Sequence, residues 1–405
     1  MVAGLSAAQL RLRSVTTLSL PDRLKPAALR DFVASIPTEH RTFLLRAVVL
    51  AAAVRFALII AGYLTAYIII GRDGVHFDQA ILETFKRWDA NHYELISEHG
   101  YPVGESYEEV IVFLPLFPYT VKVVAWVLGS WFVSALLVSA VASVAAGYFL
   151  QGIVWKDTAD EAQAGRSLWY FFLFPTAYFL AMPYTEALYM ALLLGSFWAA
   201  RRGNWLLAGI LGGFSTAARL QGIILFPALI IEALHQGGWR RPDKETAFLF
   251  LVPAGLLFYL FLNHALHDDP LAFVDFERNN WSHQRIWPWQ MIEETWLWIT
   301  DVRPHFARAA IYEFRAAFMI LTAVLLLAGA RWLRPSYQFF GWATLILFLS
   351  VSYQISLPRY VLTIFPIYFV LGRITRNQEV NQALISFSAI LMGAFYVFYA
   401  TRWGF

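Results

Sequence analysis

Long apolar runs recur along this chain from Phe43 to Tyr399, and no charged block that could fold on its own separates them. A transmembrane helix needs about 20 predominantly apolar residues, and several of the runs approach that length. Composition points the same way, because 59% of the 405 residues are hydrophobic and only 15% are charged, which is unusual for a soluble domain. We therefore expect an all-α, polytopic membrane protein with a single integral-membrane domain over residues 43–405.

The first 42 residues have a different character. They are polar and basic, and prolines interrupt them at Pro21, Pro26 and Pro37. No apolar core followed by a small-residue cleavage site occurs there, as a signal peptide would require. We expect residues 1–42 to form a cytoplasmic tail.

The apolar runs, bounded by charged or Gly/Pro-containing loops, predict about eleven membrane spans. Several are shorter than the roughly 20 residues of a perpendicular helix, which indicates broken helices around a cavity. The expected spans lie near residues 46–71, 131–154, 168–182, 186–200, 204–218, 221–236, 246–266, 307–330, 336–354, 360–372 and 380–400.

The stretch 111–128 decides the topology, because it is apolar enough to cross but contains two prolines and Lys122. If it does not cross, the predicted cytoplasmic loops hold eleven lysines and arginines, while the short outer loops hold only Arg219 and Arg359. This asymmetry follows the positive-inside rule. We therefore expect 111–128 to be re-entrant or interfacial on the outer face, with the N-terminus inside, the C-terminus outside and long outer loops at 72–130 and 267–306.

Several classes of site are excluded or disfavoured by composition. The chain has no cysteine, so disulfides, zinc thiolates, iron-sulfur clusters and thiol nucleophiles are excluded. Its net charge of +3 is dispersed over loops, which argues against nucleic acid as a partner. Asp268 and Asp269 are adjacent and form no Asp-X-Asp motif, and His264 and His267 lack a carboxylate at ligand spacing. We expect no metal and no other cofactor.

The first outer loop contains the string Arg87-Trp88-Asp89-Ala90-Asn91-His92-Tyr93. At helical spacing Asp89, His92 and Tyr93 share one face, so a carboxylate, an imidazole and a phenol could act together. Such a carboxylate can accept a proton from an attacking hydroxyl. The alternative is a solvated loop helix, and spacing alone favours this alternative.

Arg219 and Arg359 lie at outer helix ends, where the positive-inside rule predicts few cations. A guanidinium is well shaped to bind a lipid phosphate. The alternatives are snorkelling to headgroups or a structural ion pair with Glu186, and Glu186 could also simply occupy a helix start. Just before Arg219 in the sequence, Gly203, Gly209, Gly212 and Gly213 are expected to allow close helix packing.

Five motifs carry a resemblance to a known family. They are RWDANHYELISEHGY at 87–101, FLPLFP at 113–118, FPTAYFLAMPYTEALY at 174–189, TAARLQG at 216–222 and LPRYVLTIFPIYFVLG at 357–372. In this order they resemble the PIG-V family of GPI mannosyltransferases and its bacterial relatives, within the GT-C superfamily.

The resemblance implies a GT-C-like fold with helical non-cytoplasmic loops and an inverting transfer on the non-cytoplasmic face. It implies a polyprenyl-phosphate sugar donor, typically mannose, a lipid or glycan acceptor, and a multi-pass protein of the cell membrane in a prokaryote or of the ER membrane in a eukaryote. Asp89 matches the acidic residue of the first outer loop that, in this superfamily, acts as catalytic base or acceptor anchor, and the resemblance favours the base. The residues expected to bind substrate are Arg87, His92, Tyr93, Tyr184, Glu186, Arg219, Gln221, Arg359 and Tyr360.

Two other classes of function remain possible from the sequence. A transporter or flippase for a lipid-linked sugar would also use broken helices and membrane arginines. A non-catalytic scaffold subunit is the third. In the second outer loop, Trp281 and His283 are secondary candidates, since aromatic residues there suit either a sugar or the headgroup layer.

Overall fold

The computed structural model describes residues 38–401, apart from 70–75, 105–106, 241–242, 301–305 and 353–355. Residues 1–37 of the expected tail therefore lie outside the described residues. Within the described part, every regular element is helical, and the only β-type pairing is one isolated antiparallel bridge between Arg285 and Val351. The all-α prediction is confirmed for this part of the chain.

Five helical segments are long and apolar enough to cross a membrane, and they identify an integral membrane protein. They are α2 (Thr38–Leu64) with the π-helical turn η2 (Thr65–Ile69), α6 (Trp131–Thr158), η6 with α11 (Lys244–Leu251 and Ala254–His267), α14 (Phe306–Ala328) and α18 (Gln378–Ala400). Two of them start at a side-chain cap, because Ser130 accepts from Val133 N and Asn377 accepts from Val380 N.

The remaining helices of the predicted membrane region are short. At 1.5 Å per residue the 15-residue α8 is about 22 Å long, which is less than the roughly 30 Å hydrocarbon core. These helices are α7 (Glu161–Phe172), α8 (Glu186–Ala200), α9 (Trp205–Ala218), α10 (Leu225–Gln236), α15 (Pro335–Leu349), α16 (Leu357–Val361) and α17 (Pro366–Ile374).

Short 3₁₀ turns join several of these helices at one end. They are η4 (Ala177–Leu180), between α7 and α8, and η5 (Leu220–Ile224), between α9 and α10. The expected span 168–182 is wrong in its limits, since α7 ends at Phe172. The reason is Pro175, which lacks an N–H and disfavours helical geometry in the residue before it.

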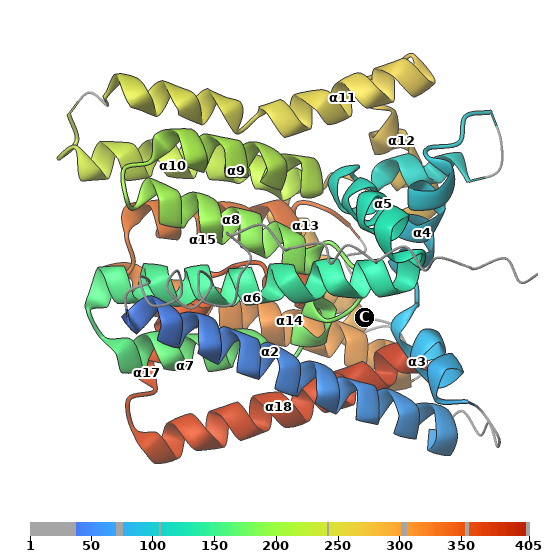
Figure 1. Ribbon diagram of the computed structural model, residues 1–405, viewed down its shortest axis with the longest axis horizontal. Coiled ribbons are helices and arrows are strands. Elements are labelled where there is room, and N and C mark those ends of the chain that lie inside the picture. Colours follow the sequence, from blue (N-terminus) through green and yellow to red (C-terminus); the bar gives the residue numbers. More distant parts are fainter. Residues whose placement is uncertain are drawn as a thin grey trace, which may run out of the picture. The chain divides into compact units, whose positions relative to one another are not determined.

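The predicted outer loops are themselves helical. The first contains α3 (Phe77–Phe85), α4 (Asp89–His99), η3 (Glu108–Val112) and α5 (Leu116–Leu128), and the second contains α12 (Ala272–Trp281) and α13 (Pro288–Thr300). Figure 1 shows α3, α4, α5 and α12 at the same end of the helices.

Helix α5 corresponds to the ambiguous stretch 111–128. It has 13 residues, or about 20 Å of helix, and it packs against α4 and α6. Val123, Trp126 and Val127 on its other side are exposed, with Trp126 at 90%. An exposed apolar face on a short helix is compatible with a re-entrant or interfacial segment, but helices of similar length occur among the expected spans, so the prediction for 111–128 stays a prediction.

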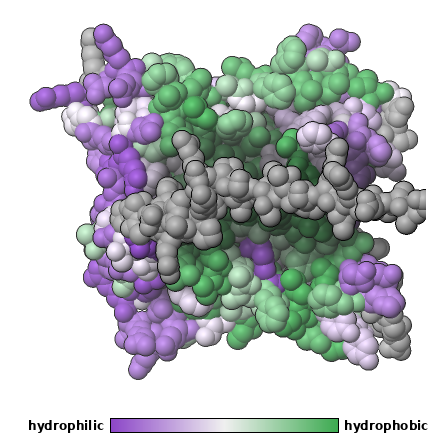
Figure 2. Space-filling view, in the orientation of Figure 1, coloured by the Kyte–Doolittle hydropathy of each residue, from purple (hydrophilic) through white to green (hydrophobic). Residues whose placement is uncertain are grey.

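Hydrophilic residues gather at the two ends of the helices, and hydrophobic residues cover much of the surface between them (Figure 2). Glycines bring the middle helices close together. A Cβ atom on Gly209 would lie 2.1 Å from the carbonyl oxygen of Phe248, and one on Gly213 would lie 2.8 Å from that of Leu251. Gly212 has similar contacts, so close packing is confirmed for these three glycines. It is wrong for Gly203, which has φ +76° and no such neighbour, because it turns the chain after α8.

Candidate active site

Three breaks between short helices bring the predicted charged residues to one place. Asp89 is the first residue of α4, and Glu186 is the first residue of α8. Arg219 stands between α9 and η5, and Arg359 lies within α16. Where the helices are interrupted, before Asp89, before Glu186 and at Arg219, backbone polar groups lie outside regular helices. A membrane protein tolerates such groups only where protein or a water-filled cavity surrounds them.

These four side chains form a row of alternating charges. Nη1 of Arg359 lies 2.6 Å from Oδ2 of Asp89, and its Nε donates to Oε1 of Glu186. The same Oε1 accepts from Nη1 of Arg219 at 2.7 Å. Glu186 is fully buried, whereas the Asp89 side chain is 26% exposed. Two arginines and two carboxylates neutralise one another, as buried charges require.

Neighbouring polar groups fix the guanidinium of Arg219 further. Nη1 of Arg219 also donates to Oγ1 of Thr185 at 2.9 Å, and its Nε donates to Gln221 at 3.3 Å. Gln221 in turn donates to Oγ1 of Thr363 at 3.1 Å. Among the described residues no hydrogen bond is made by Nη2 of Arg219 or by Nη2 of Arg359. The Nη2 groups of the two arginines, each with two N–H donors, are therefore available for a ligand.

Aromatic rings surround the guanidinium of Arg359. Its central carbon lies 4.5 Å from the ring centre of Tyr184 and 4.7 Å from that of Phe179, within the range of cation–π attraction. The Tyr184 hydroxyl donates to the carbonyl oxygen of Arg87 at 2.8 Å. This bond ties the segment before Asp89 to the segment before Glu186.

Tyr93 lies one helical turn after Asp89. Burial, together with the carboxylate of Asp89, raises the pKa of Tyr93 above its ordinary value. The phenol is therefore protonated at neutral pH and can donate a hydrogen bond. It cannot serve as a base there.

Trp88 has an unusual backbone conformation directly before Asp89. Its φ is +50° and its ψ is −121°, a region that residues with a side chain rarely adopt. Such strain costs on the order of 1–3 kcal/mol and persists where surrounding structure holds it. The strained residue here, Trp88, directly precedes the candidate base Asp89 and sets the position where α4 begins.

A cavity of about 1110 Å³ adjoins the charged row. Its charged lining includes Asp89, Arg219 and Arg359. Its apolar lining comes from η5, α11, α12 and α15 and includes Leu220, Leu256, Leu260, Val274 and Leu347. A cavity with a few fixed polar groups and a large apolar surface is typical of a site for an amphipathic ligand.

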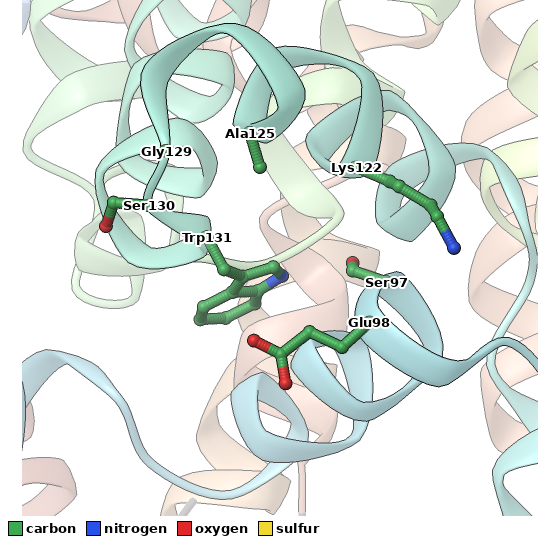
Figure 3. A pocket seen from close by; sticks show the side chains of 7 residues that line it. All are labelled: Ser97, Glu98, Lys122, Ala125, Gly129, Ser130 and Trp131. Carbon is green, nitrogen blue, oxygen red and sulfur yellow. The ribbon is translucent and has the colours of Figure 1, made fainter.

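A second, smaller cavity of about 230 Å³ lies between α4, α5 and α6. In Figure 3 the carboxylate of Glu98 lies beside the ring of Trp131, and Lys122 extends from α5 on the other side of Ser97. None of the ten predicted site residues lines it. The large cavity is therefore the candidate site.

Seven of the ten predicted site residues line the large cavity, namely Asp89, Tyr93, Tyr184, Arg219, Gln221, Arg359 and Tyr360. The other three lie around it. Glu186 lies behind the two arginines, and Arg87 contributes its carbonyl oxygen to Tyr184. His92 stacks on Phe113, with ring centres 4.9 Å apart. Helical spacing placed His92 beside Asp89, but the ring packs against η3 and α12 neighbours.

Sequence reasoning missed several residues of the site. Phe179 and Thr185 lie inside a recognised motif, so their proximity to Glu186 could have suggested them. Tyr399 gave no signal, although it lines the cavity and its hydroxyl donates to the carbonyl oxygen of Phe85 at 3.1 Å. No group of three or more His, Asp or Glu side chains that could hold a metal occurs in the described part of the chain.

A family profile described as Mannosyltransferase (PIG-V) matches residues 75–251. The chain is similar to the PIG-V mannosyltransferases. The resemblance predicted from the motifs is thereby confirmed. Asp89, Glu186 and Arg219 lie inside the PIG-V match, whereas Arg359 lies outside it and reaches the site through the fold.

Two curated relatives illustrate the extent of the likeness. The "GPI alpha-1,6-mannosyltransferase 2" of Cricetulus griseus is 29% identical over 156 residues, which are 36% of this chain and 31% of that protein. The protein of the same name from Homo sapiens is 29% identical over 208 residues, 46% of this chain and 41% of that protein. The chain thus spans less than half the length of the curated relatives it matches.

Proposed function

We propose that the chain is an integral-membrane mannosyltransferase that moves a sugar from a polyprenyl phosphate to a hydroxyl of a lipid or glycan acceptor. The observation that carries the proposal is the contact between Asp89 and Arg359 beside the large cavity. It places a proton acceptor and an anion-binding guanidinium next to each other. The similarity to PIG-V mannosyltransferases supports the choice of sugar.

The donor would bind across both kinds of lining. Nη2 of Arg219 and Nη2 of Arg359 would donate to the phosphate oxygens, since charge-assisted hydrogen bonds from guanidinium suit phosphate geometry. The polyprenyl chain would lie along Leu256 and Leu260 of α11 and Leu347 of α15. Burial of apolar chain there contributes about 25 cal/mol per Å².

Asp89 would act as the general base. The acceptor hydroxyl attacks the anomeric carbon, its proton passes to Asp89, and the bond between that carbon and the phosphate oxygen breaks with inversion. The polyprenyl phosphate leaves with the bonding electrons, and the two arginines stabilise the charge that develops on it. Phosphate is a good leaving group, so we propose that the reaction needs no metal.

We further propose that all eleven predicted spans cross the membrane, with the N-terminus cytoplasmic and the site on the non-cytoplasmic face. The short helices α8, α9 and α15 would then place the charged row just inside the outer boundary of the hydrocarbon. The cysteine-free chain allows a direct test with a membrane-impermeant thiol reagent. Val103→Cys should react from outside and Asp243→Cys from inside; reaction of both positions from the same side would mean that α5 crosses, because it would add a sixth span to the five expected between them.

The function is tested with purified protein, labelled polyprenyl-phosphate mannose and a membrane lipid extract. Wild type should transfer label to an extractable lipid, and Asp89→Asn should not. Asn has the shape of Asp and cannot accept the proton. Transfer that is unchanged in Asp89→Asn would refute the role of this residue, and movement of labelled donor across vesicles without transfer would favour a flippase.

A further inference from the structure

A second group of polar side chains lines the large cavity, and it comes from the second outer loop. Glu277, Asn280 and Trp281 belong to the last part of α12, and His283 and Gln284 follow it. None of the five recognised motifs includes these residues, and all lie beyond the PIG-V match at 75–251. The donor proposal above uses none of them.

The imidazole of His283 is held in one orientation. Its Nδ1 contacts Oε2 of Glu277, and its backbone N–H donates to the carbonyl oxygen of Glu277 at 3.2 Å. A carboxylate accepts hydrogen bonds only, so the proton of a neutral imidazole is on Nδ1 and Nε2 is left as an acceptor. Among the described residues, Nε2 has no hydrogen-bond partner.

The segment that carries His283 is fixed to the residues that follow α15 at several points. Gln284 N donates to Oγ of Ser352 at 2.9 Å, and Ser352 N donates to the carbonyl oxygen of Gln284 at 2.9 Å. Oγ of Ser352 also donates to the carbonyl oxygen of Ser282 at 3.0 Å. Ser282 itself has φ +57°. Surrounding contacts of this kind are needed to hold such a residue in place.

Trp281 connects this group with the helix of the candidate base. Its ring lies 5.9 Å from that of Phe113 and 6.2 Å from that of His92, both nearly edge to face. His92 is three residues after Asp89 on α4. The polar group of the second loop therefore adjoins the first turn of α4, where the proposed chemistry occurs.

The composition of this group suits a sugar ring. An indole offers an apolar face with a polar edge, and amides, a carboxylate and an imidazole acceptor can pair with ring hydroxyls. Such groups can exchange their hydrogen bonds with water for hydrogen bonds with the hydroxyls of a ring that enters the cavity.

We propose that residues 277–284 bind the sugar ring of the acceptor and that Nε2 of His283, oriented by Glu277, accepts a hydrogen bond from one of its hydroxyls. This inference rests on the transferase function proposed above. It divides the cavity into a donor side, made by Arg219, Arg359 and the apolar lining of α11 and α15, and an acceptor side made by the second outer loop.

Two substitutions of the same residue test the proposal. In His283→Asn the amide can still donate to Glu277 but no acceptor reaches the position of Nε2, whereas His283→Gln restores an acceptor there. Two reactions are measured with labelled polyprenyl-phosphate mannose: transfer at increasing amounts of membrane lipid extract, and hydrolysis of the donor by water without extract. His99→Asn, an exposed histidine on α4 with 71% of its side chain accessible, is the control.

We expect His283→Asn to raise the amount of extract needed for half-maximal transfer about tenfold, the loss of one hydrogen bond. Hydrolysis of the donor should stay within about twofold of wild type. His283→Gln should recover part of the loss, and His99→Asn should behave as wild type. This pattern requires an effect on the acceptor alone, which a general loss of structure would not produce.

Other results would overturn the inference. If His283→Asn needs no more extract than wild type, His283 does not bind the acceptor. If transfer and donor hydrolysis fall together, the residue serves the donor side or the fold. If the wild type itself performs neither reaction, the transferase function fails first, and the assay separates that outcome from a failure at His283 alone.

Discussion

Glu186 and Glu232 are two fully buried carboxylates in opposite parts of the same set of short helices. Each is paired with two arginines. Glu186 at the start of α8 accepts from Arg219 and Arg359. Glu232 in α10 lies 2.9 Å from Arg334 and 3.5 Å from Arg201, the residue that follows α8. The charge chemistry of the two clusters is nearly the same.

The clusters differ in what completes them. Both oxygens of Glu232 are occupied, because Ser336 and Gln236 also donate to it, and neither arginine lines the large cavity. At Glu186 one oxygen is buried with no hydrogen-bond partner among the described residues, both arginines line the cavity, and Asp89 adds a second, partly exposed carboxylate. The Glu232 cluster, with both glutamate oxygens occupied, locks helices together. The Glu186 cluster holds its guanidinium groups toward the cavity.

Each cluster contains one aspartate besides its buried glutamate, Asp89 in the Glu186 cluster and Asp157 in the Glu232 cluster. Replacing these two aspartates should give the largest difference in transfer activity. Asp89→Asn should lower transfer of label from polyprenyl-phosphate mannose by about 10²–10⁴-fold, the usual contribution of a general base. The thermal midpoint in detergent should change little, because Asp89 remains partly exposed.

The control for this prediction is Asp157→Asn, which removes the partner of Arg201 in the Glu232 cluster. It should lower the thermal midpoint and leave the activity of the folded fraction near that of wild type. If Asp157→Asn abolishes transfer as Asp89→Asn does, the two clusters do not differ in function.

Matched substitution of the two buried glutamates comes next. Glu186→Gln and Glu232→Gln each leave arginines without their buried counter-charge, which typically costs about 3–5 kcal/mol. Both should therefore lower stability, measured as the midpoint of thermal unfolding. Only Glu186→Gln should also lower transfer per folded molecule, because Arg219 and Arg359 lose their common anchor. Equal loss of transfer in both variants would contradict the comparison.

Arg359→Lys in the Glu186 cluster and Arg334→Lys in the Glu232 cluster should change transfer less than Asp89→Asn does. Arg359 uses Nε for Glu186 and Nη1 for Asp89, a geometry that a lysine ammonium cannot reproduce. Loss of one charge-assisted hydrogen bond, about 1.5–3 kcal/mol, predicts a decrease in transfer of roughly 10–150-fold. Arg334→Lys, whose side chain is partly exposed, should keep transfer within about twofold.

The difference between the clusters could be predicted from the sequence only in part. Apolar runs and the asymmetry of lysine and arginine located the helices, because hydrophobic burial and loop charge are properties of local segments. The same rule singled out Arg219 and Arg359 as exceptions. Glu186 was recognised as a possible partner of these arginines, and the structure contains both pairs.

The remainder depends on contacts between distant segments. Arg359 and Asp89 are 270 residues apart, and no local pattern reports that they meet. His92 shares a helical face with Asp89 by spacing, yet its ring packs on Phe113, since η3 returns beside α4. The contact between His283 and Glu277 depends on the turn at Ser282, which has a positive φ. A serine does not predict a positive φ, so this turn could not be predicted from the sequence.

The smallest prediction concerns backbone strain, which also distinguishes the clusters. Trp88 before Asp89 has φ +50°, whereas none of Asp157, Arg201, Glu232 and Arg334 has a positive φ. Comparison of Trp88→Gly with Trp88→Ala isolates the strain, because both remove the ring and only glycine relaxes the backbone. Trp88→Gly should be the more stable by about 1 kcal/mol in chemical unfolding.

The same pair of substitutions at Trp169, within α7, provides the matched control. That position is helical, so the order should reverse and alanine should be more stable than glycine by about 1 kcal/mol. If alanine is also the more stable residue at position 88, the conformation there is not strained. Asp89 would then owe its placement to Arg359 and to the bond between Tyr184 and Arg87, without a contribution from a held backbone.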